Sequence, residues 1–161
     1  MKKLEVKVEF TVFDDVDELT QEDKELMFKA VETRKTAYAP YSKFRVGAAL
    51  LLENNEIVLG SNQENASYPS GLCAERVAIY QAGAQYPSQK IKKIAISAAS
   101  DQNITVTPIP PCGACRQAIA EYEVKQESEI EIFFMGETGK VVKSNSLKDL
   151  MPLLFDKSFL L

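Results

Sequence analysis

Histidine is absent from the 161 residues of this chain, and cysteine occurs only three times, at Cys73, Cys112 and Cys115. The absence of histidine excludes Ser-His and Cys-His nucleophile pairs, histidine general bases and histidine metal ligands. The start MKKLEVKVEF lacks the apolar core of a signal peptide, and an odd number of cysteines argues against a disulfide framework. Metal binding, redox chemistry and simple burial remain as roles for the cysteines.

The chain also lacks long apolar runs and an excess of positive charge. No run approaches the roughly 20 apolar residues that a membrane span needs. Its 19 Lys and Arg against 23 Asp and Glu give a net charge of −4, which offers little attraction for a nucleic-acid backbone. We therefore expect a soluble, cytoplasmic protein that acts without nucleic acid or membrane. Residues 1–161 are expected to form one domain, with residues 1–15 as an N-terminal arm or strand outside its core.

Hydrophobic periodicity predicts an opening helix, a hairpin and then alternating helices and strands. Thr20 and Asp23 resemble a capping box at the start of a helix that continues through Tyr38 and ends before Pro40. The predicted strands are 46–52, 57–61, 91–98, 129–135 and 140–143, and later helices are expected at 73–84, near 113–122 and after Ser146. This order implies a three-layer α/β/α sandwich around a five-stranded mixed sheet.

The strongest chemical signal is the combination of Cys73-Ala74-Glu75 with a later Pro111-Cys112-Gly113-Ala114-Cys115. Cys112 and Cys115 are three positions apart at a predicted helix start, so their Cβ atoms are about 5–6 Å apart on one face. Zinc binds cysteine sulfur at about 2.3 Å, and three protein ligands leave the fourth tetrahedral position open, as in catalytic zinc sites. The pattern therefore predicts one Zn²⁺ held by three thiolates.

Two residues next to Cys73 extend this hypothesis. Glu75 is close enough to move a proton between a water molecule on the metal and a substrate nitrogen. Arg76 is a permanent cation, and we expect it to offset the thiolate charge by hydrogen bonding to sulfur from outside the ligand set. Each residue has a simpler interpretation. The Cys-x-x-Cys pair alone also fits a redox pair or two buried cysteines, while Glu75 and Arg76 also fit a solvated helix surface.

At these residues the sequence resembles the small homotetrameric cytidine deaminases, and the resemblance covers about residues 20–155. The matching segments are Tyr41-Ser42-x-Phe44, Val46-Gly47-Ala48-Ala49, Asn62-x-Glu64-Asn65-Ala66-Ser67-Tyr68, Cys73-Ala74-Glu75-Arg76, Pro111-Cys112-Gly113-Ala114-Cys115-Arg116-Gln117 and Pro152-x-x-Phe155. The resemblance implies hydrolytic deamination of cytidine and deoxycytidine to uridine and deoxyuridine with release of ammonia, as in pyrimidine salvage. In this chemistry a zinc-activated water attacks C4 of the pyrimidine, while Glu75 moves protons to N3 and to the leaving amino group.

The resemblance also implies substrate contacts. Asn62 and Glu64 would bind the ribose 3′-hydroxyl, Phe44 would pack on the pyrimidine, and the backbone amide of Ala74 would assist at the base. Ala66, Tyr68 and Phe155 would reach the site of a neighbouring subunit in a homotetramer. In the simpler interpretation, Asn62 and Glu64 only decorate a turn, and both phenylalanines belong to the core.

Two positions depart from the family pattern. Arg45 replaces the usual proline and adds a charge beside Phe44, which could favour an anionic substrate such as cytidine monophosphate. Pro110 replaces the usual serine or threonine. Among other functions, deamination of an analogue such as blasticidin S is the nearest alternative, followed by a non-catalytic zinc or redox protein, and editing of RNA or DNA is disfavoured by the net charge.

Overall fold

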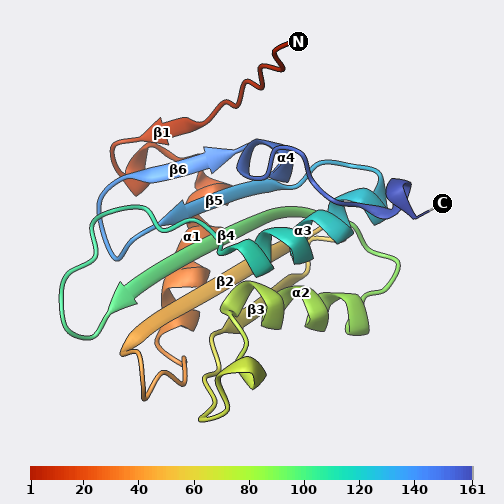
Figure 1. Ribbon diagram of the computed structural model, residues 1–161. Helices are drawn as coiled ribbons and strands as arrows, with labels where there is room; N and C mark the ends of the chain where they lie inside the picture. The colour runs from red at the N-terminus through yellow and green to blue at the C-terminus, as the bar shows by residue number, and fades with distance from the viewer. Residues whose placement is uncertain (161) are drawn as a thin grey trace.

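The computed structural model describes residues 1–160, which form one mixed sheet with helices on both of its faces (Figure 1). The six strands are ordered β1-β6-β5-β4-β2-β3. Their bounds are β1 Thr11–Phe13, β2 Phe44–Leu52, β3 Ile57–Ser61, β4 Ile91–Ser100, β5 Glu131–Met135 and β6 Val141–Ser144. The helices are α1 Gln21–Arg34, α2 Ala74–Gln85, α3 Gly113–Gln126 and α4 Leu147–Leu150.

The sheet has six strands, so the prediction of five is wrong. The additional strand, β1, pairs antiparallel with β6 at the edge of the sheet. It lies within residues 1–15, which the sequence predicts as an arm or strand outside the core, but only residues 11–13 pair with β6. Of the remaining pairs only β4 with β5 is parallel, and α3 lies in the connection between them, as a parallel pair requires.

Alternate residues of the strands build two apolar clusters on opposite faces of the sheet. Along β2, Ala48 and Leu50 belong to a cluster with α2, α3 and α4, while Ala49 and Leu51 belong to a cluster with α1. In Figure 1, α1 lies behind the sheet and α2 and α3 lie side by side in front of it. The helices that begin at the cysteines thus share one face.

The first helix begins as predicted and ends earlier. The Thr20 side chain accepts a hydrogen bond from the backbone N–H of Asp23 and donates its own hydroxyl to the Asp23 carboxylate. The helix ends at Arg34 rather than before Pro40, so Ala37 and Tyr38 lie outside it. The backbone N–H of Tyr38 instead donates to the carbonyl of Asn62, which draws the chain towards the end of β3.

The other predicted elements are confirmed with small shifts at their ends. The hairpin of β2 and β3 is present, and Ser146 caps α4 through the backbone N–H of Lys148. The helices α2 and α3 and the strand β4 each continue beyond the predicted C-terminal boundary. Within residues 1–160, no helix combines the length and apolar character needed to cross a membrane.

Candidate active site

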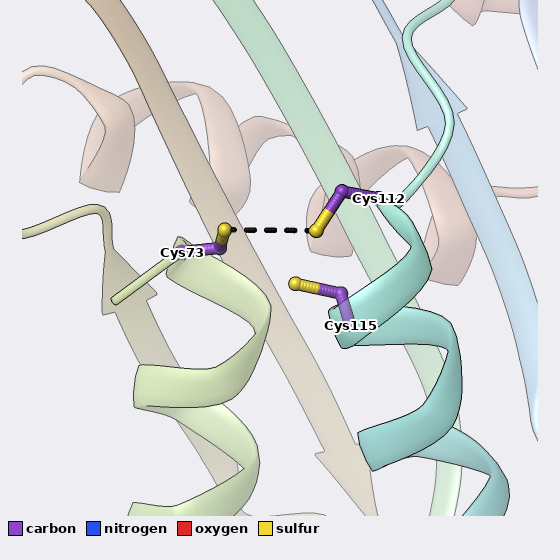
Figure 2. Close-up of side chains that lie close together, drawn as sticks. All are labelled: Cys73, Cys112 and Cys115. Carbon is purple, nitrogen blue, oxygen red and sulfur yellow. Dashed lines mark hydrogen bonds between the residues drawn. The ribbon is translucent and has the colours of Figure 1, made fainter. Parts of the chain in front are cut away.

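The three cysteines converge between the first turns of α2 and α3, as Figure 2 shows. Their sulfur atoms all lie within 4.8 Å of one another, and the Sγ atoms of Cys73 and Cys112 are 3.8 Å apart although 39 positions separate them. Two sulfurs bound at about 2.3 Å to one tetrahedral zinc ion are about 3.8 Å apart. All three are free thiols. The spacing therefore fits a zinc ion bound by three sulfurs, as the sequence predicted.

Both helix starts are arranged to favour sulfur anions. Cys73 is the N-cap of α2 and Cys112 the N-cap of α3, and neither side chain caps a backbone N–H. The first amides of an α-helix have no partner within the helix, and they give this end a partial positive charge. Both helix starts therefore place free amides and a partial positive charge near the sulfur group.

The thiols do not titrate alike. Hydrogen bonding to Cys115, and then to Arg76 and Cys112, lowers the pKa of Cys73 to about 5. The same interaction with Cys73, together with burial, raises the pKa of Cys115. Three thiolates this close repel one another unless a cation lies among them. A bound dication is therefore what would allow all three to be ionised together.

Glu75 is placed beside the sulfurs by the first turn of α2. The residue is only 4% exposed, and its Oε2 atom has no hydrogen-bond partner among residues 1–160. Burial, followed by the charge of Cys73, raises the pKa of Glu75 to about 7. An unpaired buried carboxylate oxygen is costly, so its presence here points to a partner that binds in the site.

Arg76 reaches the same group of sulfurs from the next position of α2. Its Nη2 donates to Cys73 Sγ at 3.8 Å, whereas its buried Nε finds no partner in the described part of the chain. The hydrogen bond to Cys73 raises the pKa of Arg76, which keeps the guanidinium charged. A fixed positive charge thus lies against the sulfur group.

A cavity of about 510 Å³ opens beside Cys73 and Arg76 and extends to the segment that follows β3. Asn62 and Glu64 line it, together with Tyr41, Ser42 and Tyr68. Its volume is in the range of small-molecule sites, which is about 300–1,000 Å³. Cys73, Arg76 and the candidate ribose contacts therefore meet at one cavity, whereas Cys112, Cys115 and Glu75 do not line it.

Asn62 and Glu64 also hold the backbone around this cavity. Asn62 Oδ1 accepts from the N–H of Val46 at 2.8 Å, and its Nδ2 donates to the carbonyl of Phe44 at 3.0 Å. Glu64 Oε2 accepts from the N–H of Tyr41 at 2.9 Å. Hydrogen bonding from Ser42, and then from the Tyr41 amide, keeps the pKa of Glu64 below its usual value. Both side chains thus fix the start of β2, a contribution that the sequence did not reveal.

The remaining predicted contacts fall into two groups. Phe44 begins β2 on the same face as Val46 and Ala48, which is the face of α2 and α3, and Ala74 is fully buried in the first turn of α2. Ala66, Tyr68 and Phe155 are exposed, with Tyr68 75% and Phe155 55% accessible. Ala74 directly follows Cys73, but neither Phe44 nor Ala74 lines the cavity beside Cys73. The second group is accessible from outside this chain, and of its members only Tyr68 lines that cavity.

Arg45 forms an ion pair instead of presenting an unpaired charge. Its Nε donates to both carboxylate oxygens of Asp101 at 2.8 and 3.0 Å, and its Nη1 donates to the carbonyl of Ala37. This hydrogen bonding raises the pKa of Arg45 and lowers that of Asp101. The cation beside Phe44 is therefore neutralised. Pro110 is exposed and precedes the buried Pro111. Because proline has no backbone N–H, neither residue can donate a hydrogen bond to the sulfur group.

Arg116 supports the Cys112 side of the site in a way that sequence spacing did not predict. Its Nε donates to the carbonyl of Pro111 at 2.8 Å, and its Nη1 donates to the carbonyl of Leu150 at 2.8 Å. These bonds tie the approach to α3 to the end of α4. The residue was visible only as part of the matched segment, because its partners are backbone atoms that the fold brings together.

Comparison with known protein families identifies the chain. Residues 20–128 match the model of the family described as the cytidine and deoxycytidylate deaminase zinc-binding region. The chain belongs to this family. The matched residues include all three cysteines, Glu75 and Arg76.

Individual relatives show how far the similarity extends. The cytidine deaminase of Halalkalibacterium halodurans is 45% identical over 100 residues, covering 62% of this chain and 71% of the relative. The cytidine deaminase of Sporosarcina psychrophila is 36% identical over 134 residues, covering 83% of this chain and 91% of the relative. Among solved structures, the cytidine deaminase of Burkholderia pseudomallei superimposes with a TM-score of 0.71 at 36% identity, covering 85% of this chain and all of that one.

Proposed function

We propose that this chain is a zinc-dependent enzyme that deaminates cytidine and deoxycytidine hydrolytically, giving uridine and deoxyuridine with release of ammonia. One observation carries the proposal: three cysteine sulfurs within 4.8 Å of one another lie beside a buried carboxylate oxygen that has no partner in the described chain. The relatives called cytidine deaminases support the choice of substrate.

Cys73, Cys112 and Cys115 would hold the zinc ion. When bound, zinc supplies a Lewis acid that lowers the pKa of a coordinated water, and three protein ligands leave room for that water. Within residues 1–160, the three cysteines are the one group of three or more His, Cys, Asp or Glu side chains whose ligand atoms are close enough together to bind a metal ion. It contains no fourth protein donor, which supports a catalytic rather than a purely structural zinc.

Glu75 would move the protons of the reaction. Burial raises the pKa of Glu75 above that of an exposed carboxyl group, which makes its carboxylate a stronger base for accepting a proton. Oε2 is the atom without a partner, so it is the atom available to a water molecule or to a pyrimidine nitrogen. The carboxylate would accept one proton from the attacking water and donate it to N3. It would then accept the remaining proton of the same oxygen, now bonded to C4, and pass it to the amino group, so that the C4–N bond breaks, ammonia leaves and the C4 carbonyl forms.

Arg76 would offset the charge of the sulfurs without binding the metal. Three thiolates and a dication sum to −1, which weakens the metal as a Lewis acid, and a guanidinium donating to Cys73 reduces the charge on that sulfur. We expect Arg76→Ala to lower both zinc affinity and turnover. Unchanged zinc affinity and turnover in Arg76→Ala would show that this guanidinium is an ordinary surface group.

The cavity beside Cys73 would bind the nucleoside. Asn62 and Glu64 would bind the ribose 3′-hydroxyl, and Phe44 and the backbone amide of Ala74 would contact the base. Each polar side chain keeps bonding capacity after its backbone contacts, because one amide N–H of Asn62 and one carboxylate oxygen of Glu64 are not used by them. Polar groups fixed in this way favour substrates that carry the hydroxyl.

The proposed enzyme is a homotetramer in the cytoplasm, with sites shared between subunits and a role in pyrimidine salvage. The exposure of Ala66, Tyr68 and Phe155 supports sharing, because apolar side chains at a subunit interface are accessible in one chain alone. The two apolar clusters on opposite faces of the sheet likewise support the three-layer arrangement that the family resemblance implies.

A substrate panel tests this function. Purified enzyme would be supplied with cytidine, deoxycytidine, cytidine monophosphate and blasticidin S, with ammonia release and zinc content measured in parallel. We expect about one zinc per subunit and the highest kcat/KM for the two nucleosides. If activity were highest on blasticidin S, the proposed substrate would be wrong. If the protein bound zinc but released ammonia from none of the four compounds, it would be a zinc-binding protein and not a deaminase.

A further inference from the structure

The N-terminal arm, defined as residues 1–10, is extended and has no strand partner among residues 1–160. Figure 1 shows it leaving β1 and projecting away from the sheet. All ten residues are exposed, including Leu4 at 77% and Val6 at 51%. The arm continues an edge strand, because β1 pairs with β6 on one side and its other side is the outer edge of the sheet. Unprotected strand edges readily pair with another chain.

The arm carries the pattern of a strand. From Lys3 to Phe10 the residues are Lys-Leu-Glu-Val-Lys-Val-Glu-Phe, so odd positions are charged and even positions are apolar. In an extended chain this alternation gives one charged face and one apolar face. The apolar row continues from the arm into β1, and Phe10 of the arm and Val12 of β1 line a largely apolar cavity of about 540 Å³ with Phe134 and Leu150. The arm thus offers both an open edge and an apolar face continuous with the domain.

The order of the charges identifies a partner. We propose that the arms of two copies of this chain pair as antiparallel strands, with Val6 opposite Val6 across a twofold axis. In this register Lys3 lies opposite Glu9 and Glu5 lies opposite Lys7, and the twofold axis repeats both pairs. Opposite charges directly across an antiparallel pair are stabilising, whereas like charges are destabilising. All eight charged side chains of residues 3–9 in the two arms are then matched.

Other registers match fewer charges. A shift of two residues in one direction places Lys7 opposite Lys7 and Glu5 opposite Glu9, and a shift in the other direction places Glu5 opposite Glu5 and Lys3 opposite Lys7. A shift of one residue places charged side chains on the apolar face. Parallel pairing in register places every charge opposite an identical charge. The sequence is therefore complementary to itself in one antiparallel register, which is the form that a twofold interface requires.

This pairing is independent of the deaminase site. The arm precedes residues 20–128, which match the family, and none of its residues lines the cavity beside Cys73. The paired arms would connect the outer edges of two six-stranded sheets. Their function would be to link subunits, either within an assembly formed by other surfaces or between two such assemblies.

Disulfide trapping tests the register. In Val6→Cys, mild oxidation is expected to convert most of the protein to a covalent dimer on a non-reducing gel, and mass spectrometry should find two copies of the same N-terminal peptide joined through the introduced thiol. The unchanged protein, with its three native cysteines, controls for other cross-links. Leu4→Cys and Val8→Cys should each cross-link several-fold less alone than when the two proteins are mixed, because these positions lie opposite each other. A monomeric Val6→Cys protein, or equal cross-linking of Leu4→Cys by itself, would overturn the proposal.

Exchanging the charges at positions 5 and 7 tests whether opposite charges across the two arms determine their pairing. In the Val6→Cys background, Glu5→Lys places the introduced lysine of one copy opposite Lys7 of the other, and we expect the cross-linking rate to fall at least several-fold. Glu5→Lys combined with Lys7→Glu restores opposite charges and should restore the rate. Failure of the double exchange to restore cross-linking would overturn the proposal. Because the readout is a covalent dimer and not turnover, its failure is distinguishable from failure of the deaminase assignment.

Discussion

Gly60 lies against the first turn of α2, where an added Cβ would be 2.4 Å from the carbonyl oxygen of Ala74 and 2.6 Å from the backbone nitrogen of Ala78. Real Cβ atoms do not approach backbone atoms so closely. The helix that carries Cys73 and Glu75 therefore rests directly on the backbone of β3. This contact sets the distance between the helix start and the sheet.

Gly60→Ala should displace this helix start. Overpacking of a core commonly costs about 1–3 kcal/mol, and here the atoms that must move are backbone atoms of α2. We expect a lower free energy of unfolding together with weaker zinc binding, measured by thermal unfolding and by competition with a chromophoric chelator. Gly113→Ala is the matched control for stability, because no atom lies within 4 Å of its added Cβ. Equal stability and zinc affinity in the two variants would show that α2 tolerates the displacement.

Arg116→Ala should loosen the Cys112 side of the site. It removes two hydrogen bonds, to the carbonyls of Pro111 and Leu150, and bonds involving a charged group contribute about 1.5–3 kcal/mol each when buried, with less expected at this partly exposed position. We expect reduced stability and reduced zinc affinity. Gln117→Ala is the control, since it removes one exposed bond to the carbonyl of Phe155. A zinc affinity equal to that of the control would contradict a supporting role for Arg116.

Removal of zinc should lower stability as well as activity. Structural zinc contributes about 10–16 kcal/mol to folding in small peptides, which is comparable with the whole stability of a domain. Without a cation the three sulfurs can ionise together only against their mutual repulsion. We expect a chelator to lower Tm and added zinc to restore it, as measured by calorimetry. An apo form that melts at the same temperature as the zinc form would refute this coupling.

The Arg45–Asp101 pair should keep the enzyme selective for nucleosides. A guanidinium already bound to a carboxylate offers little attraction to a substrate phosphate. We therefore expect kcat/KM for cytidine to exceed kcat/KM for cytidine monophosphate. Asp101→Asn should reduce the ratio of these two values, because it removes the carboxylate that binds the Arg45 guanidinium. A wild-type preference for the monophosphate would show that Arg45 binds phosphate despite Asp101.

Local patterns predicted much of this molecule. The capping residues Thr20 and Ser146, the β2–β3 hairpin and the two cysteine segments are short-range features, and each lies where the sequence indicates. The sequence left residues 1–15 open as an arm or a strand outside the five-stranded sheet, because β1 is defined by its pairing with β6, which lies far along the chain. The end of α1 was misplaced because a backbone bond from Tyr38 to Asn62 competes with the helix.

The site shows the same division. Residue type and spacing identified the three cysteines, and the structure brings their sulfurs together. The side chain of Asn62 binds the backbone of Phe44 and Val46, and the side chain of Arg116 binds the carbonyls of Pro111 and Leu150. These contacts depend on backbone groups that the fold brings together. No spacing rule reports such contacts, because the partners carry no distinctive side chain.

The most direct test is the turnover of cytidine by wild type and by Glu75→Gln, with zinc content measured on the same samples. The substitution keeps the size of the side chain and removes its ability to carry a proton. We predict one zinc per subunit in both proteins and a loss of about 10²–10⁴-fold in kcat for Glu75→Gln, the usual contribution of a general acid–base. Turnover close to the wild-type rate in zinc-loaded Glu75→Gln would contradict the account.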